Sequence, residues 1–217
     1  MIEHVYRRTA AARGITRVIV ATDDARIARA VEHFGGEAIM TAASHQSGTD
    51  RLAEVARDLD AEIVVNVQGD EPLLEPAMID DAIAPLAADP TIEMGTLRRL
   101  IEDPADLDNP HVVKVVVDRE GFALYFSRAA IPYVRSGQRT DGAWRHVGLY
   151  VYRRETLLRL ASLPQTPLER SEALEQLRAL EHGIRILATE TQFDTIGVDT
   201  PADLDRVRRM AATFARV

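Results

Sequence analysis

The sequence contains no cysteine, which excludes disulfide bonds, thiolate metal sites and cysteine nucleophiles. It also contains no apolar run near the roughly 20 residues that cross a bilayer. No cluster of lysine and arginine stands out, and the formal net charge is -8, so we expect no nucleic-acid partner. No G-x-G-x-x-G motif follows an expected strand, which argues against a sugar-nucleotide oxidoreductase.

The first eight residues, MIEHVYRR, lack the continuous apolar stretch that follows the basic start of a secretory signal. We therefore expect a soluble, cytoplasmic protein with no membrane partner. The 217 residues are enough for one large α/β domain with a sizeable core. The negative net charge leaves an anionic substrate open, because a few local arginines can bind one.

The first ninety residues alternate between patterns typical of helices and of strands. The expected order is a helix over 2–13 closed by Gly14 in a left-handed conformation, a strand over 17–22, a helix capped by Asp23 or Asp24, a strand over 37–40, a helix capped by Ser47 or Thr49 that ends near residue 59, a strand over 63–67 and a helix over 76–87. This alternation predicts a parallel sheet covered by helices.

The remainder has a mixed pattern. Two strands over 112–117 and 122–126 flank the turn sequence DREG, which predicts a hairpin. Further elements are a strand over 145–152, one helix over 166–182 with a capping box of Thr166 and Glu169, a strand over 184–189 and a helix from Thr200. This half therefore predicts a mixed extension of the sheet with a small lobe.

Two acidic residues are candidate metal ligands. Asp70 follows an apolar strand and Gly69, at the edge of an open sheet where ligands bind. A carboxylate there suits magnesium, which binds one or two carboxylates together with substrate phosphates. The alternative is an Asp that only stabilises a turn. Asp199 precedes Thr200 and Pro201 and can equally serve the start of a helix, so its candidacy depends on a pairing with Asp70.

The loop over residues 45–51, HQSGTDR, is dense in polar groups. Gln46 offers both a donor and an acceptor to a base edge, Gly48 permits close approach of the backbone, and Arg51 offers a fork to an oxyanion. The alternative is a solvated loop that leads into a capped helix.

The strand over 145–152 places His146, Gly148, Tyr150 and Tyr152 on one face and apolar residues on the other. Polar-tipped rings around a glycine gap suggest a pocket floor, and a half-exposed sheet is the alternative. The single helix predicted over 166–182 puts Glu172, Glu175, Gln176 and Ala179 on one stripe, from which Glu175 and Gln176 can reach sugar hydroxyls. Arg128 ends the hairpin and can pair with a carboxylate.

Together these segments resemble the bacterial 3-deoxy-manno-octulosonate (Kdo) cytidylyltransferases. The matching stretches, in the family's order, are HQSGTDRLAE (45–54), VVNVQGDEP (64–72), ALYFSR (123–128), RHVGLY (145–150), LEQLR (174–178) and GVDTP (197–201). They span nearly the whole chain. The related sialic-acid cytidylyltransferases share the fold and chemistry but not this set of stretches.

The resemblance implies an α/β fold with a doubly wound, mixed but mainly parallel sheet of the nucleotide-diphospho-sugar transferase type, and a small substrate or dimerisation lobe. It implies one domain over 1–217, with a nucleotide side over 1–90 and a sugar side over 91–217. The implied reaction joins CTP and Kdo into CMP-Kdo and pyrophosphate for lipopolysaccharide biosynthesis, with Mg²⁺, in a homodimer.

The resemblance also assigns residues to roles. Asp70 and Asp199 match the catalytic, metal-binding aspartates. The nucleotide-side matches are Gln46, Ser47, Gly48, Arg51 and Gln68, and the sugar-side matches are Arg128, His146, Tyr150, Glu175 and Gln176. No covalent nucleophile is expected, because positioning and electrostatics can supply most of the rate.

The family begins with an apolar strand and a basic Pro/Gly loop, whereas this sequence opens in the helix that follows them. We therefore expect weak or no activity from the chain as written, through either a misassigned start codon or a shortened protein. Two alternatives to the Kdo enzyme stay open: a sialic-acid cytidylyltransferase, and a non-catalytic sugar-binding, nucleotide-binding or dimerisation module.

Overall fold

The structure is a computed structural model that describes residues 1–45, 47–135, 142–195, 197–198 and 200–214. The chain divides into two compact units. The first contains residues 1–61, 66–80 and 193–217, and the second contains residues 62–65 and 81–192. The chain therefore passes between the units several times.

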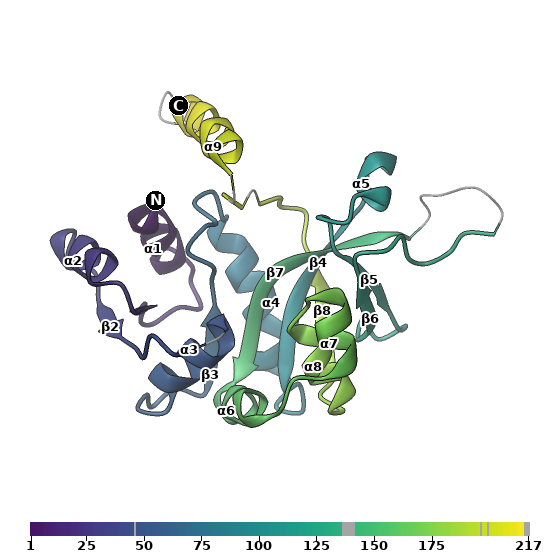
Figure 1. The fold of residues 1–217 in the computed structure, drawn as a ribbon, viewed down its shortest axis with the longest axis horizontal. Helices are drawn as coiled ribbons and strands as arrows, with labels where there is room; N and C mark the ends of the chain where they lie inside the picture. Colours follow the sequence, from purple (N-terminus) through teal and green to yellow (C-terminus); the bar gives the residue numbers. More distant parts are fainter. Residues whose placement is uncertain (46, 136–141, 196, 199, 215–217) are drawn as a thin grey trace. The chain divides into compact units, whose positions relative to one another are not determined.

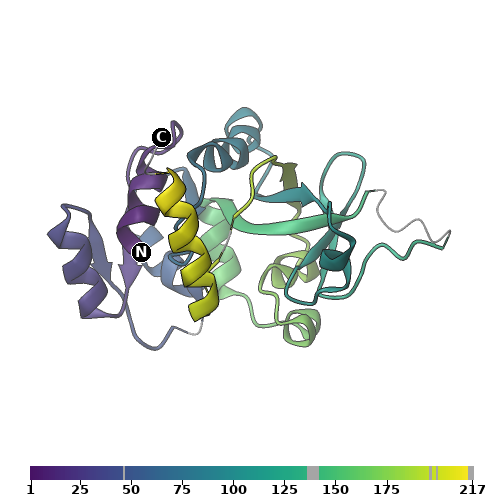
Figure 2. The same cartoon turned by 90° about the horizontal axis from the view of Figure 1, so that it is seen from above.

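The first unit contains the helices α1 (Ile2–Ala10), α2 (Ala25–His33), α3 (Gly48–Ala56) and α9 (Pro201–Phe214), and the strands β1 (Val20–Thr22) and β2 (Ala38–Met40). The two strands pair in parallel. Helices α1 and α2, purple in Figure 2, lie side by side. Apolar residues such as Val5, Val31 and Ala53 are buried in this unit. Asp24 and Ser47 cap the helices that follow β1 and β2, since each side chain accepts a backbone N–H.

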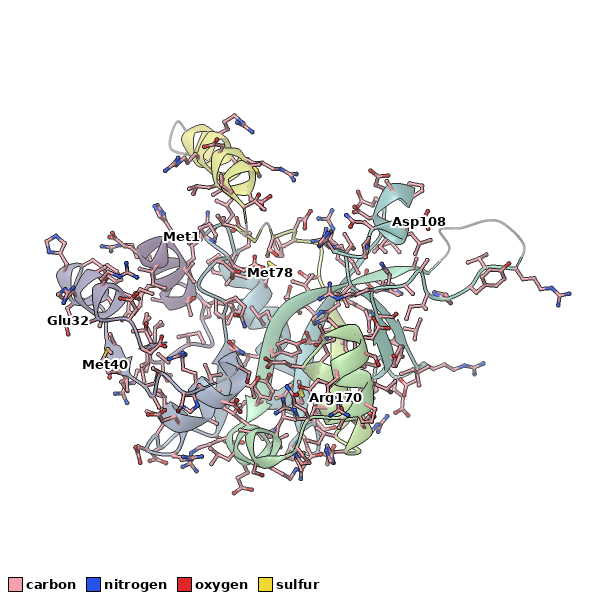
Figure 3. All side chains as sticks on the ribbon, viewed as in Figure 1. Met1, Glu32, Met40, Met78, Asp108 and Arg170 are labelled. Atoms are coloured by element: carbon pink, nitrogen blue, oxygen red, sulfur yellow. The ribbon has the colours of Figure 1, made fainter. Side chains whose placement is uncertain are left out.

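Two elements pass from one unit into the other. Strand β3 (Ile63–Asn66) supplies three residues to the second unit and its last residue to the first. Helix α4 (Pro76–Ala88) begins in the first unit and ends in the second. Met78 of this helix, labelled in Figure 3, is fully buried. The carboxyl end of β3, where Asp70 follows, therefore belongs to the first unit.

The second unit is built on a six-stranded mixed sheet (Figure 1). Its other strands are β4 (Met94–Leu100), β5 (Lys114–Val117), β6 (Ala123–Ser127), β7 (Trp144–Arg153) and β8 (Ile186–Glu190). The order is β6-β5-β7-β4-β8, and β3 also pairs with β7. Strands β4 and β8 are parallel, whereas β7 is antiparallel to both β4 and β5. Strands β6 and β8 stand at the two ends of this order, yet Phe122 beside β6 forms a bridge to Leu187 of β8. The sheet therefore curls.

The described residues of the second unit also form four short helices: α5 (Pro104–Asp108), α6 (Arg154–Ser162), α7 (Pro167–Glu172) and α8 (Gln176–Glu181). Helix α6 contacts β7, α8 contacts β6, and α7 packs on α8. No helix in the described part of the chain is long and apolar enough to cross a membrane.

An irregularity in the pairing of β4 with β7 shapes one face of the sheet. Thr96 pairs with Tyr150 and Leu97 with Val147, so Gly148 and Leu149 have no partner on β4. Such bulges bend a strand and re-aim its side chains. Gly148 is exposed, and a Cβ built on it meets no atom within 4 Å. The strand thus has open space beside its glycine.

The predicted α/β class and the hairpin are confirmed, and the hairpin strands β5 and β6 pair antiparallel. Two helix predictions are wrong. Helix α1 ends at Ala10, before Gly14, whose N–H instead donates to Asp80 at 2.9 Å. The single helix over 166–182 is two helices, because Ala173 adopts a left-handed φ of 50° between them. Strand β4 and helices α5 and α6 have no counterpart in the sequence prediction.

Candidate functional site

Asp70 lies half-buried just after β3, as the sequence predicts. Its backbone carbonyl accepts the N–H of Val198 at 2.9 Å. Asp199 lies outside the described residues, but Val198 directly precedes it in the sequence. The segment between β8 and α9 therefore returns to Asp70. No cluster of three or more His, Asp and Glu side chains suited to a metal occurs among the described residues.

Gln68 and Ser47 have contacts within the first unit. The Gln68 side-chain amide donates to the Asn66 side chain at 3.3 Å, which holds Gln68 at the end of β3. The Ser47 hydroxyl accepts the N–H of Asp50 at 3.2 Å and so caps α3. Gly48 is the first residue of α3, and a Cβ on it meets nothing within 4 Å. Gln46 lies outside the described residues. A backbone this open at a helix N-terminus can approach an anionic ligand closely.

Arg51 of α3 joins the ends of two strands. Its guanidinium donates to the Thr41 hydroxyl at 2.5 Å, just after β2, and lies 3.3 Å from the Asp23 carboxylate, just after β1. Only 21% of the Arg51 side chain is exposed. Arg51 therefore does not point out from the helix as a solvated side chain. It holds together the loops at one edge of the β1–β2 sheet.

The face of β7 predicted as a pocket floor carries a row of rings. His146 lies 5.0 Å from Phe126 and 5.3 Å from Tyr150 between ring centroids, and Tyr150 lies 6.0 Å from Tyr152. Tyr152 is buried, whereas His146 and Tyr150 are half-buried and flank the open Gly148. Polar ring atoms beside empty space can bind a hydroxylated ligand.

The opposite face of β7 is the apolar one. Val147, Leu149 and Val151 are all at most 4% exposed. The predicted apolar face of the strand is therefore the buried one. The opposite face, with the polar-tipped rings, is the one that can meet a ligand.

His146 is held by strand β4. Its Nε2 lies 3.0 Å from the hydroxyl of the fully buried Thr96. Burial, with a smaller effect of Arg145, lowers the pKa of His146 to about 3, so the imidazole is neutral at pH 7. Burial also raises the pKa of Tyr150, with smaller effects of Tyr152 and Glu175, so this phenol keeps its proton.

Arg128 uses its donors inside the protein. Its guanidinium donates to the backbone carbonyls of Glu172 at 2.8 Å, Pro110 at 3.0 Å and Ala173 at 3.4 Å. The Glu172 carboxylate in turn accepts the Arg128 N–H and the Ser127 hydroxyl. Although burial alone raises it, the pKa of Glu172 is lowered because these donors favour its charged form. Arg128 therefore connects β6 to the end of α7.

Glu175 and Gln176 lie at the start of α8, after the break at Ala173. Glu175 is exposed, and its charge contributes to the raised pKa of Tyr150. Gln176 is 6% exposed, and its side-chain Nε2 is buried with no hydrogen-bond partner in the described part of the protein. Because a buried unpaired donor is costly, this amide fits a site for a ligand acceptor. The break contradicts the single continuous stripe of Glu172, Glu175, Gln176 and Ala179.

Two residues of β4 were missed by the sequence analysis. Thr96 contacts His146, and Arg98 pairs with His146 across the strands and therefore shares its face. The Arg98 guanidinium lies 4.6 Å from the Trp144 ring, and two of its nitrogens are buried without a hydrogen-bond partner among the described residues. Such a cation suits an anionic ligand. Met94, Thr96 and Arg98 stand at every second position, and this period of two was the sequence signal that could have predicted a strand here.

Comparison with known proteins agrees with this geometry. A protein-family model described as "Cytidylyltransferase" matches residues 1–186. A 3-deoxy-manno-octulosonate cytidylyltransferase of Geobacter metallireducens is 57% identical over 99% of this chain and 88% of its own length.

Among solved structures, one of CMP:2-keto-3-deoxy-manno-octonic acid synthetase complexed with CTP matches with a TM-score of 0.93 and 44% identity, over 98% of this chain and 87% of that one. A 4-diphosphocytidyl-2C-methyl-D-erythritol synthase of Anaerococcus prevotii matches with a TM-score of 0.65 and 12% identity, over 97% and 88% of the two chains. At that identity the likeness shows the fold alone. The extent of the first three matches shows that this chain belongs to the 3-deoxy-manno-octulosonate cytidylyltransferase family.

Proposed function

We propose that this chain transfers CMP from CTP to Kdo and releases pyrophosphate. In this reaction the anomeric hydroxyl oxygen of the sugar forms a bond to the α-phosphorus of CTP. The bond from that phosphorus to the oxygen bridging to the β-phosphate breaks, and the hydroxyl proton passes to solvent. The reaction needs no covalent intermediate with the protein. The contribution of the protein is therefore to align the two reactants and to stabilise charge.

The observation that carries the proposal is the hydrogen bond from Val198 to Asp70. It joins the segment after β3 to the segment that leads into α9, and these contain the two aspartates matched to the family's metal ligands. Carboxylate oxygens are suitable ligands for Mg²⁺, which completes its shell with water and substrate phosphates. Bound there by Asp70 and Asp199, Mg²⁺ would neutralise charge on the triphosphate.

The second unit supplies the proposed sugar side. His146 and Tyr150 border the space over Gly148, and Nε2 of Gln176, which has no partner within the described parts of the chain, can donate to a sugar hydroxyl. Arg98 lies on the same face of the sheet as His146, and two of its guanidinium nitrogens have no hydrogen-bond partner among the described residues, which suits the carboxylate of an acidic sugar. The contacts of Arg128 favour a supporting role, in which it fixes β6 against α7.

The same proposal includes nucleotide binding by Gln46, Ser47, Gly48, Arg51 and Gln68. It also includes a homodimer that acts in the cytoplasm in lipopolysaccharide biosynthesis. These points rest on the family resemblance.

The test is pyrophosphate release from CTP and Mg²⁺ with Kdo or N-acetylneuraminate as the acceptor. The proposal expects release that depends on Kdo. Release with N-acetylneuraminate alone would identify a sialic-acid enzyme instead. Calorimetric titration with each substrate separately covers the remaining alternative, because sugar affinity without any turnover would identify a binding module.

A further inference from the structure

The hydroxyl of Thr96 lies among three polar groups of β7. Its Oγ1 is 2.9 Å from the carbonyl oxygen of Leu149, 3.2 Å from that of Val147 and 3.0 Å from Nε2 of His146. Thr96 is fully buried, so water does not compete for these contacts. The contacts occur where β7 bulges and leaves Leu149 without a partner on β4.

Counting protons fixes the direction of the hydrogen bond to His146. A threonine hydroxyl has one proton to donate and two lone pairs to accept. The carbonyls of Leu149 and Val147 can only accept, and if the hydroxyl donated to His146 instead, the Thr96 oxygen would face the Leu149 carbonyl oxygen at 2.9 Å with no proton between them. The hydroxyl proton therefore goes to the carbonyls. Toward His146 the Thr96 oxygen therefore accepts, and the proton in that contact is on Nε2.

The other ring nitrogen is then determined as well. A neutral imidazole carries one N–H, and the burial that lowers the pKa of His146 keeps the ring neutral at pH 7. With the proton on Nε2, Nδ1 is an acceptor. The described part of the protein offers Nδ1 no hydrogen-bond donor, and the ring borders the open space over Gly148.

We propose that Thr96 is a positioning residue that fixes His146 as the Nε2–H tautomer, so that Nδ1 accepts a hydrogen bond from a hydroxyl of the bound sugar. The identity of that ligand rests on the proposed function, whereas the tautomer does not. One consequence concerns specificity. A lone pair on Nδ1 accepts a hydrogen bond from a hydroxyl and repels a carboxylate oxygen. His146 therefore binds a hydroxyl of the acidic sugar, and the sugar carboxylate binds a cationic group elsewhere.

The direct test is the nitrogen chemical shifts of His146, measured by NMR on the full chain with ¹⁵N-labelled histidine and no substrate. The His146→Gln spectrum identifies the signals by their loss. The inference expects a protonated Nε2 and an unprotonated Nδ1 at pH 7. A proton on Nδ1, or a doubly protonated ring, would overturn it. Because this measurement needs no variant of Thr96, it stands even if such a variant misfolds.

A pair of variants tests the role in binding. Thr96→Ser keeps the hydroxyl and is expected to keep the tautomer and the Kdo affinity. Thr96→Val has a similar shape but no acceptor, and we expect a mixture of tautomers and a Kd for Kdo about tenfold higher, with the Kd for CTP unchanged. Equal Kdo affinity in the two variants would overturn the binding role.

Failure of the proposed function shows differently, as a chain with the expected tautomer that neither binds Kdo in calorimetric titration nor forms pyrophosphate with it. That result contradicts the sugar ligand and still supports the hydrogen bond from His146 to Thr96.

Discussion

The two units hold their candidate residues in different ways. In the second unit, contacts between partly buried groups far apart in sequence fix the sugar-side residues: Glu172 accepts from Ser127 and Arg128 across 44 or 45 positions, and Thr96 contacts His146 across 50. In the first unit, the nucleotide-side residues follow strand ends, and two of them have local contacts, the cap by Ser47 on Asp50 and the hydrogen bond from Gln68 to Asn66. The pair of Arg51 with Asp23 is half-exposed on its Asp23 side.

This difference indicates how each side responds to a ligand. Side chains held by partly buried, long-range hydrogen bonds and by ring contacts are pre-organised, so a ligand orders little on binding. Half-exposed pairs in loops contribute little energy, so a ligand can replace them at low cost. We expect the sugar side to keep its geometry when Kdo binds and the nucleotide side to adjust when CTP binds.

The largest expected effect tests the buried ion pair of the second unit. The Arg178 and Glu169 side chains are 8% and 4% exposed, and two hydrogen bonds join them at 2.5 and 2.9 Å. Arg178→Met leaves a buried carboxylate unpaired and should lower the unfolding free energy by about 3–5 kcal/mol in urea denaturation.

Arg159→Met is the matched control for that variant. It breaks the more exposed pair with Glu93 and should cost no more than about 1 kcal/mol. Equal losses in the two variants would remove the contrast between buried and exposed contacts.

The next effect tests the first unit. Asp70→Asn removes a carboxylate proposed to hold Mg²⁺ and should lower kcat for pyrophosphate release roughly a hundredfold, with a higher requirement for Mg²⁺. The exposed Asp60→Asn serves as the control and should leave both quantities unchanged. Full activity of Asp70→Asn at low Mg²⁺ would contradict the metal site.

A smaller effect compares two glycines of the second unit. A Cβ at Gly148 meets nothing within 4 Å, whereas one at Gly95 lies 2.8 Å from a Leu86 methyl group. Gly148→Ala should therefore keep its Tm and raise KM for Kdo, because it narrows the space between His146 and Tyr150. Gly95→Ala should lose about 1–3 kcal/mol of stability through overpacking. A normal KM in Gly148→Ala would place the sugar elsewhere.

The smallest effect concerns pH. Because burial lowers the pKa of His146 to about 3, the unfolded chain takes up this proton first as the pH falls below roughly 6.5. The stability contributed by the neutral ring is complete above that pH and is lost progressively toward pH 3. His146→Gln should therefore lose less unfolding free energy between pH 7 and pH 5 than the unaltered chain. An identical loss would mean that His146 titrates normally.

Elements whose sequence signal lies within a few neighbouring residues were predicted. The apolar run of β3, the hairpin around Asp118 and the caps at Asp24 and Ser47 were all visible in the sequence. Strand β4 was missed because Arg98 and Arg99 interrupt its apolar pattern. It is a strand because β7 and β8 pair with it on both sides.

The helix break at Ala173 was also missed because it depends on contacts between residues far apart in the sequence. The segment around it has helical propensity, but Glu172 is anchored to Ser127 and Arg128 by contacts that no local pattern encodes. The same contacts explain why Arg128, predicted to grip a carboxylate, donates to backbone carbonyls instead. For the proposed site, the sequence predicted His146, Tyr150 and Gln176 through their position in the strand or helix and the family match, and these stay predictions. It gave no signal for Thr96, because the role proposed for Thr96 depends on a bulge in another strand.

The most direct test of the sugar site is a crystal structure of the chain with Kdo. We expect the sugar to lie over Gly148, with hydroxyls within hydrogen-bond distance of Nδ1 of His146 and Nε2 of Gln176. A sugar bound away from β7, with the Gln176 amide still unpaired, would contradict it.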